Sequence, residues 1–337
     1  MSEAAPGRAR AGVRDVAAAA GVSTQTVSRV INDHPHIRPE TRDRVIAAMS
    51  ELGYRVNNAA RALGTATTRT IGVLATDTHL FGPAAGIAAL ERAARSAGRW
   101  IATAYADGTD AASVTAAADH LLVQGVDGIV VVAPHTAALA ALASARIGVP
   151  VVPLHGEAGE PGAGGAARQA QGAALAVDHL ADAGHRRIAQ VSGPAEWLEA
   201  VARDSGVEAA LARRGLTAAG RWRGDWSAGS GAALAAEIAP VLRTAEAPTA
   251  FVVANDQMAL GLVSGLAALG VDVPGEVSVV GFDDHPDAAF YRPPLTTVRL
   301  DIAGEARRCV QVLLGDDNSA GPQRPELVVR ASTACYR

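Results

Sequence analysis

Four residues in the second half of the sequence have side chains suited to a molecule with several hydroxyl groups. Asn255 follows the apolar run Phe-Val-Val-Ala and Asp283 follows Val-Val-Gly-Phe, so each is expected just past the end of a strand. Arg203 comes about three helical turns after another strand-like segment, Val-Ser-Gly-Pro. A guanidinium, an amide and an ionised carboxylate together match vicinal hydroxyls, which both donate and accept hydrogen bonds. Trp226, in the segment GDWSAGSG, adds a flat surface on which a pyranose ring can stack.

Each of these residues also has a simpler structural explanation. Arg203 could be a charge on the surface of a helix, and Trp226 could be an aromatic side chain of the core. Asn255 could serve only as the N-cap of the helix that follows it. The sequence alone leaves these alternatives open.

A second group of polar residues, near the N-terminus, is placed to read DNA bases. Thr24, Gln25 and Arg29 fall on one side of a predicted helix, residues 24–31, away from its apolar residues. Gln can bond adenine bidentately, Arg can do the same with guanine, and Thr offers a hydroxyl or a methyl group. Ser23 is a good N-cap for this helix, and Gly21 permits a tight turn before it.

Two further helices are expected around this base-reading segment. The apolar residues of the first recur at helical spacing over 13–20. Helix, Gly-containing turn and helix form the helix-turn-helix signature. A third helix is predicted from Pro39 to Leu52, with Pro39 at its first position. Its N-cap would be Arg38, which makes the helix start weaker by about 1 kcal/mol than Ser would.

From Thr70 onward, short apolar runs alternate with longer helical patterns. This alternation predicts doubly wound parallel sheets in two lobes, with a ligand crevice between them at the carboxyl ends of the strands. LTTVRLD and IAGEARRCVQVLLG are expected to return into the first lobe, before a final strand in PELVVRAS. The predicted strands are TIGVLA, WIATA, GIVVV and VPVVPL in the first lobe, and RIAQVSG, TAFVVA and EVSVVGF in the second.

Other motifs do not assemble an enzyme or a metal site. Asp283 and Asp284 are adjacent, so their side chains project to opposite sides and would not flank one glycosidic bond. Residues 162–167 fit the dinucleotide-binding pattern G-x-G-x-x-A, but they lie too far from the preceding strand, and we interpret them as a loop between the lobes. His34 and His36 lack further ligands. We expect no catalytic residue, no cofactor and no metal.

Composition supports a DNA-binding end attached to a near-neutral core. The chain has 337 residues, 49% of them hydrophobic, and a net charge of −4. Residues 1–68 carry nine Arg and six acidic residues, so the positive charge is concentrated there. Two cysteines, Cys309 and Cys335, form no disulfide framework, and no secretory or membrane-spanning segment is visible. We therefore expect a cytoplasmic protein with no membrane partner, bound to the nucleoid when on DNA.

The N-terminal motif V-R-D-V-A-x-x-A-G-V-S-x-x-T-V-S-R-V-I-N closely resembles the headpiece of the lactose-repressor (LacI) family. The segments VANDQMALG, SVVGFDD and RPPLTTVRLD continue the resemblance through the core, which the family builds like a periplasmic binding protein. The family also implies a hinge helix in 55–63 that pairs with a partner's and inserts Leu63 into the minor groove. The resemblance implies DNA-binding roles for Ser23, Thr24, Gln25, Ser28, Arg29, Asn32, Asn57 and Leu63. It implies effector binding by Phe81, His155, Arg203, Trp226, Asn255 and Asp283.

The sequence departs from the family pattern on the first-lobe side of the expected site. His155 stands where an Asp is usual, and Val132 replaces an Asn. Glu305 and Gly86 take the places of apolar residues that face the ligand. The stretch Arg168–Gln171 replaces a segment that usually forms the first strand of the second lobe. The family's second-lobe contacts are thus retained, whereas those of the first lobe differ.

These observations predict an all-α helix-turn-helix headpiece joined to an α/β periplasmic-binding-protein-like core of two doubly wound lobes. The expected function is repression of sugar-utilisation genes from a pseudo-palindromic operator, with release when a galactoside-like sugar binds between the lobes. The alternatives are a transport-type sugar-binding protein, or a regulator with a non-sugar effector or corepressor. We expect a homodimer, and no tetramer, because no leucine-heptad tail follows the last strand. The predicted parts are a disordered tail (1–11), the headpiece (12–56), hinge and linker (57–69), and a core (70–337) with lobes at 70–165 plus 298–324 and at 166–297 plus 325–337.

Overall fold

The computed structural model describes residues 11–32, 34–55, 67–132, 135–154, 165–316 and 321–336. The chain separates into two compact units, Met1–Thr68 and Arg69–Arg337, which are described separately. Residues 1–10 of the expected tail and the hinge segment 56–66 lie outside the described residues. In the part of the chain that the structure describes, no helix is long and apolar enough to cross a membrane.

The first unit is a three-helix headpiece composed of α1 (Val13–Ala20), α2 (Thr24–Ile31) and α3 (Pro39–Glu51). Val16, Val27 and Val45, one from each helix, are fully buried at its centre. The Ser23 hydroxyl accepts a hydrogen bond of 3.1 Å from the amide of Thr26 and so caps α2 as expected. Arg38 precedes α3 without a side-chain cap.

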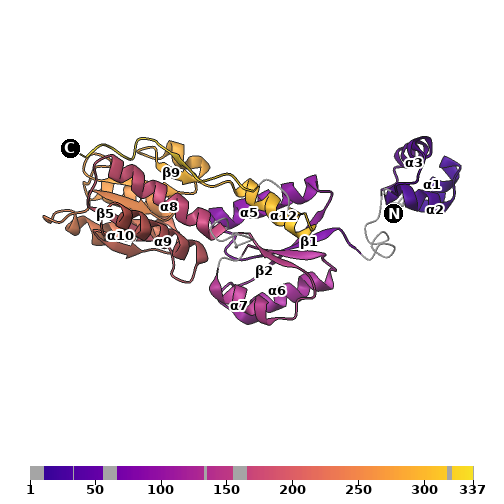
Figure 1. The fold of residues 1–337 in the computed structure, drawn as a ribbon, viewed down its shortest axis with the longest axis horizontal. Coiled ribbons are helices and arrows are strands. Elements are labelled where there is room, and N and C mark those ends of the chain that lie inside the picture. The colour runs from indigo at the N-terminus through magenta and orange to yellow at the C-terminus, as the bar shows by residue number, and fades with distance from the viewer. Residues whose placement is uncertain are drawn as a thin grey trace, which may run out of the picture. The chain divides into compact units, whose positions relative to one another are not determined.

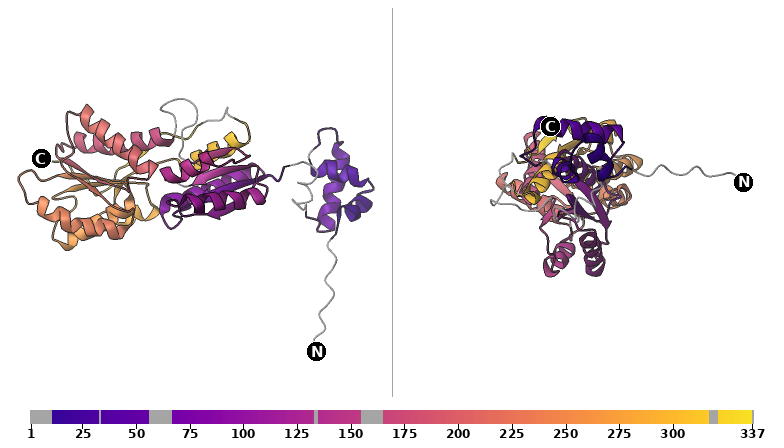
Figure 2. Two further views of the ribbon diagram at one scale, coloured as in Figure 1. Left: turned by 90° about the horizontal axis from the view of Figure 1, so that it is seen from below. Right: turned by 90° about the vertical axis from the view of Figure 1, so that its right-hand side faces the viewer.

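The first lobe of the second unit contains a four-stranded parallel sheet in the order β2-β1-β3-β4. Its helices cover both faces of the sheet (Figures 1 and 2). Core residues such as Leu90 and Val130 are fully buried between these layers. The elements are β1 (Thr70–Ala75), α5 (Phe81–Ser96), β2 (Trp100–Tyr105), α6 (Ala111–Val123), β3 (Gly128–Val132), α7 (Thr136–Ser144) and β4 (Val151–Pro153).

The second lobe contains a six-stranded sheet in the order β10-β9-β8-β7-β5-β6. All neighbouring strands are parallel except β9 and β10, which are antiparallel. Helices again lie on both faces of the sheet (Figure 2). The elements are α8 (Gly165–Asp182), β5 (Ile188–Ser192), α9 (Leu198–Arg213), β6 (Arg221–Arg223), α10 (Ala228–Val241), β7 (Ala250–Val253), α11 (Asp256–Ala268), β8 (Ser278–Phe282), the 3-10 turn η1 (Pro286–Phe290), β9 (Thr296–Arg299) and β10 (Glu326–Val328).

The predicted fold class is confirmed, with three local differences. The segment LTTVR does not return to the first lobe, because β9 pairs with β8 over residues 296–298. The chain returns only at α12 (Ile302–Leu313), which packs against α5 (Figure 1). Residues 165–167, expected in a loop, form the first turn of α8, which also contains Arg168–Gln171. The short strand β6 was not expected, because its three residues are too few to show a pattern.

Candidate functional site

A cavity opens between the two lobes of the core, at the carboxyl ends of their strands. The space between its lining residues is about 990 Å³ when the part open to solvent is included. The second-lobe wall is polar and aromatic, with Gln169, Trp197, Glu199, Arg203, Trp226, Asn255, Gln257 and Asp283. The first-lobe wall is apolar, with Leu80, Phe81, Pro83, Val131, Val132, Leu139, Pro153 and Leu154.

Arg203 is a buried residue of this cavity and not a surface charge. It is only 7% exposed, and its guanidinium lies 3.8 Å from the centre of the Phe282 ring. Its Nε donates to Gln169 Oε1 at 2.8 Å, and a terminal nitrogen donates to Asp283 Oδ1 at 3.2 Å. Another terminal nitrogen donates to the carbonyl oxygen of Ala254. These bonds fix the orientation of the guanidinium at the cavity wall.

Asp283 is held in an unusual backbone conformation directly after β8. Its φ is +110° and that of Asp284 is +49°, so the chain makes a left-handed bend that is sterically unfavourable for both residues. Burial raises the pKa of Asp283, although the neighbouring Arg203 guanidinium opposes this effect. Two adjacent carboxylates thus take separate partners: Asp283 pairs with Arg203, and Asp284 pairs with Arg299 and Arg330, each at 2.6 Å.

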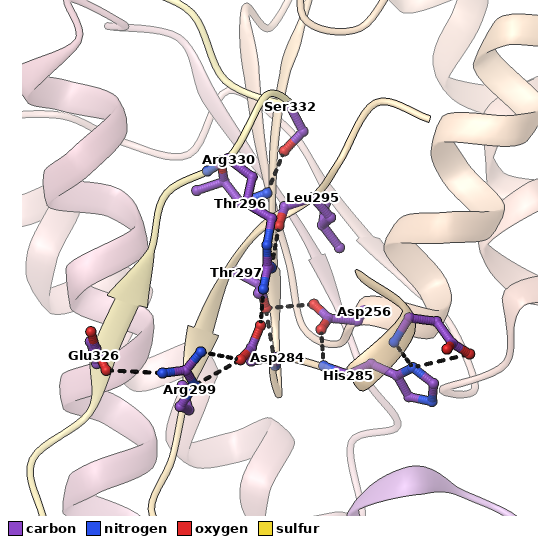
Figure 3. A network of polar contacts seen from close by, with 11 residues as sticks. Asp256, Asp284, His285, Leu295, Thr296, Thr297, Arg299, Glu326, Arg330 and Ser332 are labelled. Atoms are coloured by element: carbon purple, nitrogen blue, oxygen red, sulfur yellow. Dashed lines mark hydrogen bonds and ion pairs between the residues drawn. The ribbon is translucent and has the colours of Figure 1, made fainter. Parts of the chain in front are cut away.

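A polar network maintains the bend that presents Asp283 (Figure 3). Asp256, in the first turn of α11, accepts hydrogen bonds from the Thr297 hydroxyl at 2.6 Å and from the His285 amide at 2.7 Å. It therefore ties β9 to the loop that follows Asp284. Because Asp284 is bonded to Arg299 and Arg330, both sides of the bend are anchored. The network is thus a support for the cavity residue Asp283.

Asn255 combines the structural role and the site position that the sequence left as alternatives. Its Oδ1 accepts a hydrogen bond of 2.9 Å from the amide of Met258, which makes it the N-cap of α11. Its Nδ2 donates to the carbonyl oxygen of Trp226 at 2.9 Å. Trp226 has a φ of +74°, so this second bond stabilises an unfavourable backbone position. Asn255 consequently orients the aromatic residue of the site.

Trp226 is both a core aromatic and a cavity residue. It is 5% exposed and packs edge-on against Trp197, with ring centres 5.3 Å apart. A side chain on Gly193 would come within 2.3 Å of the Trp226 ring, so this glycine gives the indole its space. The indole Nε1 is buried and has no hydrogen-bond partner in the described part of the chain. The indole can therefore donate a hydrogen bond in addition to offering a flat face.

Three buried polar atoms on this cavity lack partners among the described residues. They are Trp226 Nε1, Glu199 Oε2 and Gln257 Oε1. Buried polar groups are normally satisfied, so such a cluster indicates groups that await a ligand or water. Glu199 and Gln257 were not among the site residues predicted from the sequence. Glu199 lies one helical turn before Arg203, and this spacing was the available signal.

On the first-lobe side, Phe81 lines the cavity as expected, at the start of α5. Its ring centre lies 4.7 Å from that of His285 in the other lobe. Val132 also lines the cavity. Gly86 leaves room for Leu154, which a side chain there would approach within 2.6 Å. His155 lies outside the described residues.

Glu305 does not face the cavity as its position in the family pattern suggested. Its carboxylate is buried and accepts a hydrogen bond of 2.5 Å from Arg168 Nε. It also pairs with Arg308, one turn further along α12, at 3.3 Å. Arg168 belongs to α8 of the second lobe, so this ion pair joins the lobes. The charged residue is tolerated because its partners neutralise it.

His135 makes a second contact between the lobes. Its Nε2 lies 2.8 Å from Asp77 Oδ2 within the first lobe. Its ring packs 4.9 Å from that of Trp197 in the second lobe, and the two residues form an isolated antiparallel bridge. The aromatic wall of the cavity is thus continuous with a first-lobe side chain.

The candidate DNA-reading residues lie on the exposed side of α2. Thr24, Gln25, Ser28 and Arg29 are exposed, whereas Val27 and Val30 of the same helix are buried. Ser23 is exposed but its hydroxyl is used in capping, and Asn32 is the partly buried C-cap. Asn57 and Leu63 lie outside the described residues. Among the residues that the structure does describe, no cluster of three or more metal-ligating side chains was found.

Comparison with known proteins relates both units of the chain to one group of regulators. Residues 13–57 match the family model described as bacterial regulatory proteins, lacI family, and residues 177–333 match that of a periplasmic binding protein-like domain. The chain is 36% identical over 288 residues to the lactose operon repressor of Escherichia coli (strain K12), covering 85% of this chain and 79% of that protein. It is 30% identical over 333 residues to the HTH-type transcriptional repressor PurR of Photobacterium profundum, covering 95% and 98%. The crystal structure of the lac repressor dimer bound to operator and the anti-inducer ONPF matches with a TM-score of 0.78 and 31% identity, covering 97% of this chain and 100% of that one.

Proposed function

Because this chain belongs to the lacI family of bacterial regulatory proteins, we propose that it is a cytoplasmic repressor whose operator affinity falls when a sugar binds in the interlobe cavity. The two relatives named above are a lactose operon repressor and an HTH-type transcriptional repressor. The finer part of the proposal concerns the effector and the residues that bind it.

The observation that carries the sugar assignment is the pairing of Arg203 with Asp283 at the cavity wall. The two side chains are 3.2 Å apart, so donor and acceptor atoms stand side by side. Adjacent hydroxyls on a sugar ring accept from the guanidinium and donate to the carboxylate. Trp226 supplies a further donor through Nε1 and a flat face. The apolar first-lobe wall suits the less polar end of a glycoside.

A second candidate is a regulator with a non-sugar effector or a corepressor. The chain resembles PurR over nearly its whole length as well as the lactose operon repressor, so the likeness to the lactose operon repressor does not by itself fix the ligand. The sign of the coupling separates the candidates, because an inducer lowers operator affinity whereas a corepressor raises it. A transport-type binding protein would not need the headpiece.

The test of the effector site is calorimetric titration of galactose, lactose and cellobiose into wild type, Arg203→Ala and Asp283→Asn. Removing one partner of a buried polar pair costs about 1–3 kcal/mol, or more for a charged group, so affinity should fall at least tenfold. Operator binding in the absence of sugar should persist in both variants. Arg213→Ala is the matched control, because this residue is exposed on the same helix. Undiminished affinity in both variants would place the effector elsewhere.

For DNA, we propose that Gln25 and Arg29 read base edges, Thr24 assists them, and Ser23, Ser28 and Asn32 support the contact. Asn57 and Leu63 are proposed to act in the hinge, with Leu63 as a minor-groove wedge. Gln25→Ala should relax specificity at one base pair, at a cost of roughly 1–3 kcal/mol. Binding to a library of operator variants measures the base preference at each position. The control is Gln124→Ala, because Gln124 is exposed on the second unit, outside the headpiece. An unchanged preference at every position would contradict the role of Gln25.

A further inference from the structure

Glu199 is a cavity residue with one carboxylate oxygen, Oε2, that no other group of the described structure uses. It lies at the second position of α9, and its side chain lines the space between the lobes. The residue is partly buried, and its Oε2 atom is buried without a hydrogen-bond partner among the described residues. A buried polar atom without a partner is costly, and the usual remedy is a ligand or an ordered water.

None of the charged and titratable neighbours of Glu199 makes a hydrogen bond to its Oε2 atom in the described structure. Arg203, on the same helix, is bonded to Gln169, Ala254 and Asp283. His135, from the segment after β3, is within hydrogen-bonding distance of Asp77 through its Nε2, and its buried Nδ1 has no hydrogen-bond partner among the described residues. Asp283, after β8, pairs with Arg203 and repels a second negative charge. Glu199 therefore presents a free acceptor to the cavity.

A second, independent observation points to a ligand at this place. Trp226 is 95% buried, being 5% exposed, and its Nε1 donor has no partner in the described structure. It lines the same cavity as Glu199. The cavity thus holds an unsatisfied acceptor and an unsatisfied donor. A group that both donates and accepts satisfies the pair, and a hydroxyl is the simplest such group.

We propose that Glu199 is a specificity-determining residue that accepts a hydrogen bond from a ligand hydroxyl, and that effector binding consequently releases a proton. This inference rests on the proposed function and extends it to one contact. It assigns to the ligand a donor hydroxyl beyond those that Arg203 and Asp283 engage. Ligands that lack this hydroxyl are discriminated against because they leave the carboxylate unpaired.

The expected pH dependence follows from the state of Glu199 without ligand. Burial raises the pKa of Glu199 to about 7, against weaker opposing effects of a hydrogen bond from its own backbone amide, of Arg203 and of His135. Near neutrality the free carboxyl group is therefore partly protonated. A bound donor favours the ionised form and lowers this pKa, so affinity increases with pH through this range. If the bound form is fully ionised, affinity at pH 8 should be about tenfold higher than at pH 6.

The experiment titrates galactose, lactose and cellobiose into wild type and Glu199→Gln at pH 6, 7 and 8. Calorimetry in two buffers of different ionisation enthalpy measures the proton released. In the wild type we expect ligand affinity to increase with pH and binding to release a proton. In E199Q we expect both effects to be lost. Glu208→Gln is the matched control, because Glu208 is exposed on the same helix and pairs with Arg221. E208Q should retain the pH dependence of affinity, and a pH dependence that persists in E199Q would assign it to a group other than Glu199 and overturn the proposal.

A second arm uses the wild type alone, so it does not depend on how well a variant folds. Monodeoxy derivatives of the probe that binds best are titrated one by one. One of them should bind at least tenfold more weakly and show no pH slope. Removal of the same hydroxyl should reduce the affinity of E199Q much less than that of the wild type, because the deoxy derivative and the substitution remove the same contact.

The outcomes separate this inference from the proposed function. If R203A lost sugar binding while E199Q kept the wild-type affinity, pH dependence and proton release, the proposed sugar site would be supported and the role of Glu199 would be overturned. Equal effects of every monodeoxy derivative in wild type and E199Q would overturn it as well. If the wild type bound none of the probes, the proposed function and this inference would both fall.

Discussion

At the scale of single residues, Asp256 shows how a buried carboxyl group can support a site without touching a ligand. It is 1% exposed, and burial together with the nearby Asp283 raises its pKa well above the ordinary value. An unfolded Asp titrates near ~3.9. Between that pH and the higher folded-state pKa, the folded protein holds a proton that the unfolded chain has lost. Because the folded state binds the extra proton, the unfolding free energy falls as the pH rises from the unfolded-state pKa to the folded-state pKa.

Asp256→Asn should become more stable relative to wild type as the pH is raised. The amide resembles a protonated carboxyl group, with one acceptor for the His285 amide and one donor for the Thr297 hydroxyl. The relative gain should be about 1.4 kcal/mol for each unit by which the pKa is raised within the range measured. Urea unfolding from about pH 5 to about pH 8 measures it. Asp119→Asn, exposed on α6, is the control, and an equal pH trend in both variants would refute the explanation.

At the scale of elements, α10 and α11 pack with their backbones in close contact. A side chain on Gly261 would lie 1.8 Å from the Ala228 carbonyl oxygen, and one on Gly231 would lie 2.1 Å from that of Met258. The glycines therefore set the distance between the helix that follows Trp226 and the helix capped by Asn255. These two helices together position three of the eight residues of the polar wall, Trp226, Asn255 and Gln257.

Gly261→Ala should separate the two helices and lower the unfolding free energy by about 1–3 kcal/mol. Gly229→Ala, in the first turn of α10, is the matched control, since its nearest neighbour would be Ser227 Oγ at 3.6 Å. The control should be neutral or more stable by up to ~1 kcal/mol, because Ala favours helix. Denaturant midpoints compare the variants, and equal midpoints would exclude the proposed crowding.

The extent to which the sequence predicts these elements depends on how local their determinants are. The central strands were predictable because strands buried on both faces are continuous apolar runs, as in Gly128–Val132. The positions of Asn255 and Asp283 at the cavity were predictable because both residues directly follow such strands. The position of Arg203 was predictable because it lies about three helical turns after a strand end. Contacts between residues far apart in sequence were not predictable. Glu305 pairs with Arg168, 137 residues away in the chain, and no local sequence pattern indicates that pairing. The unpaired atom of Glu199 likewise depends on where other helices lie.

At the scale of the whole molecule, the headpiece and the cavity are expected to act through a homodimer. A single headpiece reads one half-site, so a pseudo-palindromic operator requires two, related by two-fold symmetry. We expect static light scattering at micromolar concentration to give twice the 34.2 kDa of one chain. Operator binding should be tightest at the natural half-site spacing, and spacing variants that shift one half-site by a few base pairs are the control. A stable monomer or tetramer would contradict this expectation.

The division of the cavity into a polar wall and an apolar wall has a consequence for how this protein can change. The polar wall comes from segments at 169, 197–203, 226, 255–257 and 283, whereas the apolar wall comes from 80–83, 131–132, 139 and 153–154. Mutations that alter preference for one end of a ligand therefore fall on different stretches of DNA from those that alter preference for the other. New ligand preferences can evolve by recombination or by separate mutation of the two gene regions, with one wall retained while the other varies. The same separation lets a biosensor designer build two small libraries in place of one large library.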